Sequence, residues 1–223
     1  MRKLAFIFIS VITLVACNKD QDTSIIYGYQ YFPVDTGKYV VYDVIDILHD
    51  DISGVHDTDY YQIKEVMGEE DIDLEGEPFH KLYRYKRESD TLLWQLKDVW
   101  VVKKSNSSVE VVEENKRVIR MAFSISYDQY WDCNAFNSDD PEQCYYRDIY
   151  KPKLVGTINY DSTVVVESND FLSFIEYKRS YDVYAANVGR IQMVYKDLEI
   201  DNEDTLDVQK GVELYYTAID FGG

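Results

Sequence analysis

Hydrophobic and aromatic residues alternate with polar ones along most of this chain, in short runs separated by Gly, Asn, Asp and Ser. A period of two is typical of β-strands, in which successive side chains point to opposite faces of a sheet. The runs are rich in β-branched residues and tyrosine, which favour strands. Strands are therefore expected at 39–45, 60–67, 80–87, 92–103, 109–113, 118–125, 155–160, 163–167, 171–177, 190–200 and 212–221.

About ten short strands joined by polar turns predict an all-β fold, or a β-rich α+β fold. We expect a single antiparallel-sheet domain spanning 28–223, built as a curved half-barrel or as a sandwich. Residues 161–162 are expected to form a hairpin turn. Tyr181, Tyr184, Ala185 and Val188 have helical spacing, so at most one or two short helical turns are expected.

The first sixteen residues have a different pattern. A basic start, Met1-Arg2-Lys3, precedes an apolar run over 4–15 that is too short to span a bilayer. The run ends in Leu-Val-Ala-Cys, the lipobox of bacterial lipoproteins. We interpret 1–16 as a lipoprotein signal peptide and Cys17 as the acylated (palmitate-bearing) N-terminus of the mature protein. An ordinary secretory signal with a chance cysteine is the alternative.

Residues 17–27 are expected to form a lipidated polar tether. Acyl chains on Cys17 would give stable anchoring. Because Asn18 is not the aspartate associated with inner-membrane retention in enteric bacteria, an outer-membrane location is favoured. Whether the protein is on the periplasmic or the cell-surface face is left open.

Composition limits the partners. The chain has 41 acidic and 23 basic residues and a formal charge of −18. Two of the basic residues and none of the acids belong to 1–16, so the mature protein is more acidic still. Such a surface repels phosphate backbones, and nucleic-acid binding is not expected. The 21 tyrosines argue for a folded core, since disordered chains are poor in aromatics.

Two cysteines remain once Cys17 is acylated. Export places Cys133 and Cys144 in an oxidising compartment, where a disulfide is the expected state. The loop it would close corresponds to roughly 3 kcal/mol on the chain-entropy model. A metal site or a reactive thiol is the alternative.

No catalytic motif is present. The chain has three histidines, and it lacks a G-x-S-x-G elbow, an H-E-x-x-H motif and a Gly-rich phosphate loop. We therefore expect a protein that is not an enzyme and has no cofactor. An unrecognised hydrolase is the alternative.

Three polar clusters are candidate sites. His49, His56 and Asp57 could offer ligands to zinc or another transition metal, although a plain loop over 49–59 is the alternative. The acidic loops 132–142 and 201–207 could hold calcium, but neither fits the EF-hand pattern, and solvated turns are the alternative.

Tryptophans could form a ligand platform. Trp131, with Asn134 and Asn137, is the candidate for binding a sugar ring or an acyl chain, because it lies beside the expected disulfide loop. Aromatic residues on strands more often form cross-strand pairs or fill the core, and that reading is the alternative.

Three stretches resemble motifs of a known group. They are Y-x-P-x-x-x-G-x-Y-x-x-Y over 31–42, W-x-x-N-x-F-N over 131–137 and Y-A-x-x-V-G-x-I over 184–191. In this order they resemble a group of uncharacterised Bacteroidetes-type outer-membrane lipoproteins. Cys133 replaces the glycine expected in the second motif. The resemblance implies an envelope lipoprotein with one β-rich domain and implies no activity.

The sequence thus favours a non-enzymatic, membrane-anchored envelope lipoprotein, acting as a binding or scaffold module. Its expected partners are the membrane, through the N-terminal lipid, and an envelope protein, glycan or lipid of unknown identity. One alternative is a lipid or lipoprotein carrier with an apolar concave sheet face. The second is a metal-dependent glycan-binding module or hydrolase that binds calcium or zinc.

Overall fold

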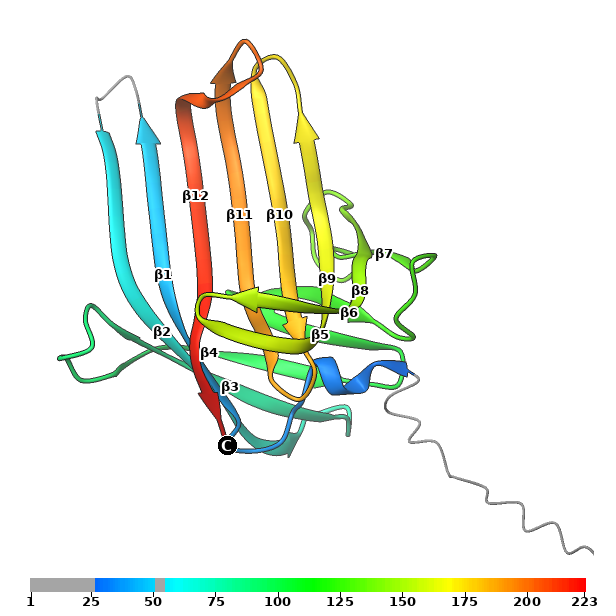
Figure 1. The fold of residues 1–223 in the computed structure, drawn as a ribbon. Helices are drawn as coiled ribbons and strands as arrows, with labels where there is room; N and C mark the ends of the chain where they lie inside the picture. The colour runs from blue at the N-terminus through cyan, green and yellow to red at the C-terminus, as the bar shows by residue number, and fades with distance from the viewer. Residues whose placement is uncertain (1–26, 51–54) are drawn as a thin grey trace, which may run out of the picture.

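The computed structural model describes residues 27–50 and 55–223, which form one antiparallel sheet of twelve strands (Figure 1). The first six strands are β1 (Tyr39–Asp50), β2 (Val55–Ile72), β3 (Pro78–Arg87), β4 (Gln95–Lys104), β5 (Ser108–Glu113) and β6 (Lys116–Ala122). The last six are β7 (Tyr130–Asp132), β8 (Gln143–Val155), β9 (Ile158–Leu172), β10 (Glu176–Ala185), β11 (Gly189–Asp201) and β12 (Asp204–Gly222). The predicted all-β, antiparallel fold is confirmed.

The strand order is β6-β5-β4-β3-β2-β1-β12-β11-β10-β9-β8-β7, so pairing between the first and last strands joins the two halves of the chain. The sheet curls until its edges approach each other. The Ile119 amide, on β6, donates to the Cys133 carbonyl at 2.9 Å, and the Trp131 indole donates to the Ile119 carbonyl at 3.0 Å. The sheet is therefore nearly closed into a barrel, and its two edges are largely protected from further strand pairing.

A second layer covers part of the outer surface. The turn end of the β8–β9 hairpin crosses β10, β11 and β12 (Figure 1), and the ring of Tyr160, on β9, lies 5.8 Å from that of Phe221 on β12. Val155 and Tyr160 pack there in one buried cluster with Val183 and Ala185 of β10. As a result, β10 is covered on both faces over this stretch.

The N-terminal segment closes one end of the sheet. A single helical turn, the 3₁₀ helix η1 (Tyr29–Tyr31), buries Tyr31, whose hydroxyl is 2.6 Å from Ser162 Oγ. Lys104 Nζ donates to the carbonyls of Tyr29 and Phe32 at 2.8 and 2.7 Å. Among the described residues, no helix has the length and apolar character needed to cross a bilayer. Cys17, the signal peptide and the tether up to residue 26 lie outside the described residues.

Several expected elements are wrong in detail. The helical turn at Tyr181–Val188 is absent, because β10 continues to Ala185. Because this strand is covered on both faces, Tyr184 and Ala185 are both buried although they point to opposite faces. Apolar residues at adjacent positions gave the segment the spacing of an amphipathic helix. Residues 161–162 lie within β9, and its hairpin turn is instead at Gly156, whose φ of +57° suits glycine.

Two further boundaries differ. The expected strand at 171–177 is a hairpin end, since β9 stops at Leu172 and β10 begins at Glu176. The expected loop over 49–59 is instead largely strand, because His49 belongs to β1, and β2 begins at Val55.

Candidate binding cavity

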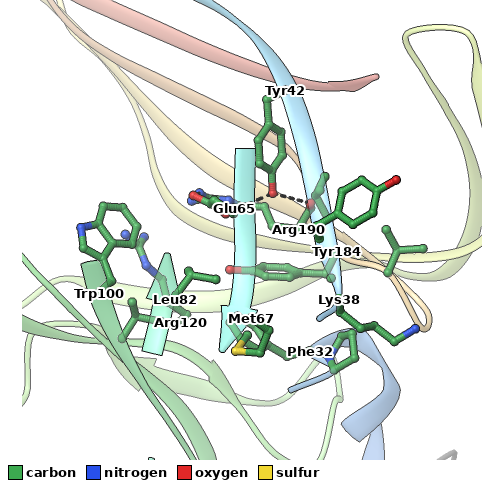
Figure 2. Close-up of a pocket in the computed structure, with 16 residues that line it drawn as sticks. Phe32, Lys38, Tyr42, Glu65, Met67, Leu82, Trp100, Arg120, Tyr184 and Arg190 are labelled. Atoms are coloured by element: carbon green, nitrogen blue, oxygen red, sulfur yellow. Dashed lines mark hydrogen bonds and ion pairs between the residues drawn. The ribbon is translucent and has the colours of Figure 1, made fainter. Parts of the chain in front are cut away.

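A cavity of about 60 Å³ lies at the end of the sheet that the N-terminal segment closes (Figure 2). Its walls come from both halves of the sheet and from the segment before β1. Most of the lining is apolar or aromatic, including Phe32, Met67, Leu82, Trp100, Tyr184 and Val188. Such walls favour an apolar group over a charged one.

Charged side chains bound the cavity on the side of the barrel interior. Glu65, on β2, accepts hydrogen bonds from Arg84 Nε at 3.1 Å and from Arg190 Nη2 at 2.9 Å. The Tyr42 hydroxyl lies 3.3 Å from the same carboxylate and 2.8 Å from the Arg190 carbonyl (Figure 2). Because Arg190 is on β11 and Glu65 on β2, this pair connects strands separated by β1 and β12.

The chain of ion pairs continues across the interior. Asp182, on β10, lies 3.6 Å from Arg190 and 3.6 Å from Arg120 of β6, and Arg120 also pairs with Glu113. Arg84 pairs with Asp98 at 3.0 Å. We call this set the arginine network: Arg84, Arg120, Arg190, Glu65, Asp98, Glu113 and Asp182. Its opposite charges alternate, which is how charge is tolerated in a protein interior.

Mutual attraction holds Glu65 and Arg190 in their charged forms. Burial alone would raise the pKa of Glu65, but Arg190 and Arg84 outweigh it and hold that pKa below its ordinary value. Burial would lower the pKa of Arg190, but the carboxylates of Glu65 and Asp182 hold it well above its ordinary value. Burial, followed by the charge of Glu65, raises the pKa of Tyr42 well above its ordinary value, so Tyr42 stays neutral.

A second interior cavity, of about 300 Å³, is more polar. Its lining includes Glu142, Ser180, Asp182 and Tyr195, and it shares Arg120 with the first cavity. This volume is at the lower end of the usual range for small-molecule pockets. Burial raises the pKa of Glu142. No histidine lines either cavity.

The inner face is therefore not the continuous apolar surface that a carrier of acyl chains requires. A charged network crosses it, and the apolar cavity beside the network is small. This arrangement weighs against the lipid-carrier alternative.

The structure brings two of the three predicted metal ligands together. His49 and His56 are directly opposite each other on β1 and β2, with Nδ1 atoms 3.4 Å apart. Asp57 follows His56 in the strand, and its side chain is therefore expected on the opposite face. In the part of the chain that the structure describes, no group of three or more His, Cys, Asp or Glu residues could hold a metal ion.

The predicted ligand platform has partners within the protein. The ring of Trp131 packs 5.0 Å from that of Tyr146, and its indole N–H is bound to the Ile119 carbonyl. The side-chain amide of Asn134 donates to the Asp140 carbonyl at 2.8 Å, and that of Asn137 donates to the Arg117 carbonyl at 3.0 Å. Through these contacts the three residues stabilise the region around the connection between β7 and β8. The predicted disulfide is present there and links Cys133, just after β7, to Cys144 in β8.

The two acidic loops that were candidates for calcium binding are turns. Asp132 Oδ1 accepts hydrogen bonds from the backbone amides of Asn134 and Glu142 at 2.9 and 3.0 Å. The second loop is a tight hairpin in which β11 ends at Asp201 and β12 begins at Asp204. Both loops thus have the structure of ordinary turns.

Sequence reasoning missed the arginine network. One signal was available, because Leu82 and Arg84 are two residues apart in β3 and so share the inner face. A charged residue on the same strand face as a core residue indicates a buried partner of opposite charge. Which residues form the network could not be predicted, since Glu65 and Arg190 are far apart in the sequence.

Two of the three sequence motifs meet at the first cavity. The motif over 31–42 contributes Phe32 and Tyr42, and the motif over 184–191 contributes Tyr184 and Arg190. The two motifs are joined by the Tyr42 hydroxyl, which donates to the Arg190 carbonyl at 2.8 Å. The third motif, over 131–137, lies at the edge where the sheet nearly closes.

No family model matches the chain, and no curated protein matches it. Among solved structures, it is similar to the crystal structure of a protein described as "a putative lipoprotein from Parabacteroides distasonis ATCC 8503". The TM-score is 0.42 and the sequence identity 11%, over 86% of this chain and 98% of that chain. A likeness at this level says nothing of activity.

Proposed function

We propose that this protein is an outer-membrane lipoprotein that acts by binding another envelope component and not by catalysis. The lipobox ending at Cys17 supports the anchor, and the polar stretch after it supports a short tether. The absence of catalytic motifs from the sequence supports a binding role. The partner is proposed to be a protein.

The observation that carries the binding role is the first cavity. It is apolar, and its volume of about 60 Å³ is well below that of a typical small-molecule pocket. A pocket of this kind suits one apolar side chain of a partner, since such anchors dominate the energy of protein interfaces. Phe32 and Lys38, which precede β1, line it, so it lies close to where the described chain begins.

The arginine network gives this cavity a firm inner wall. Arg84 and Arg190 both pair with Glu65, and Glu65 and Arg84 are buried. These side chains are therefore held in place before a partner arrives. A preorganised site loses less side-chain entropy on binding. The proposal therefore assigns the network a supporting role.

The test is to block the cavity without disturbing the fold. Val188 is a half-buried lining residue in the turn before β11, and Val188→Trp should fill the entrance. Leu206→Trp is the matched control, because Leu206 is 90% exposed and does not line the cavity. Chemical cross-linking in intact envelopes, followed by detection of this protein, should give a discrete adduct with the parent and with the control.

We expect the adduct to be lost in Val188→Trp while its melting temperature stays close to that of the parent. Cys17→Ser should also lose the adduct, because the domain is then no longer held near its partner. An adduct that persists in Val188→Trp refutes the cavity as the binding site. A parent protein that forms no adduct refutes the binding role itself.

A further inference from the structure

Two imidazoles face each other near the loop end of the β1–β2 hairpin. His49 and His56 are paired in register, with ring centroids 5.7 Å apart and Nδ1 atoms 3.4 Å apart. Two nitrogens bound to one tetrahedral metal ion at 2.0–2.1 Å are about 3.3–3.4 Å apart. The spacing of the two Nδ1 atoms therefore matches that of ligands to a shared ion.

The second nitrogen of His49 is held by a carboxylate. His49 Nε2 lies 3.0 Å from Glu213 Oε1, on β12. In the tautomer that carries its N–H on Nε2, His49 donates to this carboxylate, and Nδ1 has its lone pair on the side of His56. Metal-binding histidines characteristically donate their other N–H to a carboxylate in this way.

Glu213 is itself fixed in place. It is 8% exposed, and Lys196 Nζ lies 2.7 Å from its Oε2, to which the Tyr215 hydroxyl also donates. These two contacts fix the position of the Glu213 side chain and, through it, the orientation of the His49 ring.

One member of the pair is open to solvent. His56 is exposed, so water can reach the space between the rings and complete the coordination. The described residues offer two ligands to such an ion, and water or a group on a partner would occupy other positions.

We propose that His49 and His56 bind one divalent transition-metal ion of the zinc class, with Glu213 orienting His49. Imidazole nitrogens suit Zn²⁺, Cu²⁺ and Ni²⁺, whereas Ca²⁺ and Mg²⁺ prefer oxygen ligands. None of His49, His56 and Glu213 lines the first cavity. It does not depend on the function proposed above.

The test uses the full-length, detergent-solubilised protein, stripped of metal with a chelator and titrated calorimetrically with Zn²⁺. We expect one ion per chain and no binding of Ca²⁺ at the same concentrations. His49→Ala and His56→Ala should each weaken Zn²⁺ binding at least about tenfold, because each removes one of two protein ligands. His80→Ala is the matched control, since His80 is on β3 and contacts Glu70 instead.

Glu213→Gln keeps both histidines and removes the orienting charge, so it should weaken binding by about 10-fold to 100-fold. Melting curves without metal show whether each variant is folded. The proposal is overturned if the parent binds no Zn²⁺, or if His49→Ala and His56→Ala bind it as well as the parent. It is also overturned if His80→Ala weakens binding equally, because the ion is then held non-specifically.

Discussion

Removing the charge of Glu65 should destabilise the whole fold. Glu65 is buried and accepts from Arg84 and Arg190, so Glu65→Gln keeps the shape of the side chain but leaves two guanidinium groups under-compensated. Breaking a buried ion pair from one side costs about 3–5 kcal/mol. In a domain of this size each kcal/mol lowers the melting temperature by roughly 2–4 °C, so a fall of roughly 6–20 °C is expected.

The assay is thermal unfolding followed by circular dichroism in the β-sheet region. Asp71→Asn is the matched control, because Asp71 is also on β2 but forms an exposed ion pair with Lys81 at 3.3 Å. Exposed pairs contribute little to stability, so the control should melt with the parent. A melting temperature of Glu65→Gln within about 2 °C of the parent would refute the view that the network supports the fold.

The contribution of Glu65 to the free energy of unfolding should decrease in acidic solution. The pKa of Glu65 is lower in the folded protein than its ordinary value. Its contribution to stability is therefore complete above the unfolded pKa of about 4.3, and is lost as pH falls through the folded pKa. The stability difference between the parent and Glu65→Gln should be constant above about pH 5 and shrink in more acidic solution. A difference that grows on acidification would contradict this assignment.

Three further predictions concern the anchor, the disulfide and a turn. Cys17→Ser should move the protein from the membrane fraction to the soluble fraction, and unchanged partitioning would exclude lipidation. Cys133→Ala should expose one reactive thiol at Cys144 and lower the free energy of unfolding by about 3 kcal/mol; a parent that already titrates as a thiol there would disprove the bridge. Gly189→Val should destabilise by about 1–3 kcal/mol in denaturant, because Gly189 has φ +104°, which side chains rarely adopt; unchanged stability would show that the turn relaxes.

Alternation of apolar and polar residues was enough to predict most strands of this sheet. It failed where the period is interrupted, as in β8, which contains Pro152 and shifts register between Arg147 and Lys153. Proline removes a ladder hydrogen bond and makes such a run look like a loop. It also failed for β10, since a strand covered on both faces loses its alternation.

The candidate cavity could not be predicted from the sequence, because it forms only when the two halves of the sheet come together. Arg190 and Glu65 are separated by 125 positions, and no local pattern pairs them. The His49–His56 pair was closer to prediction, since both residues stood in one polar segment. The sequence suggested Asp57 as a third ligand and gave no sign of Glu213, which contacts His49 from β12.

The central claim, that a lipid holds this β-sheet domain at a membrane, is tested most directly by intact mass measurement of the protein purified from the membrane fraction. The account predicts a chain that begins at Cys17 and carries the added mass of acyl chains. A chain that retains residues 1–16, or one that begins at Cys17 without added mass, would contradict it.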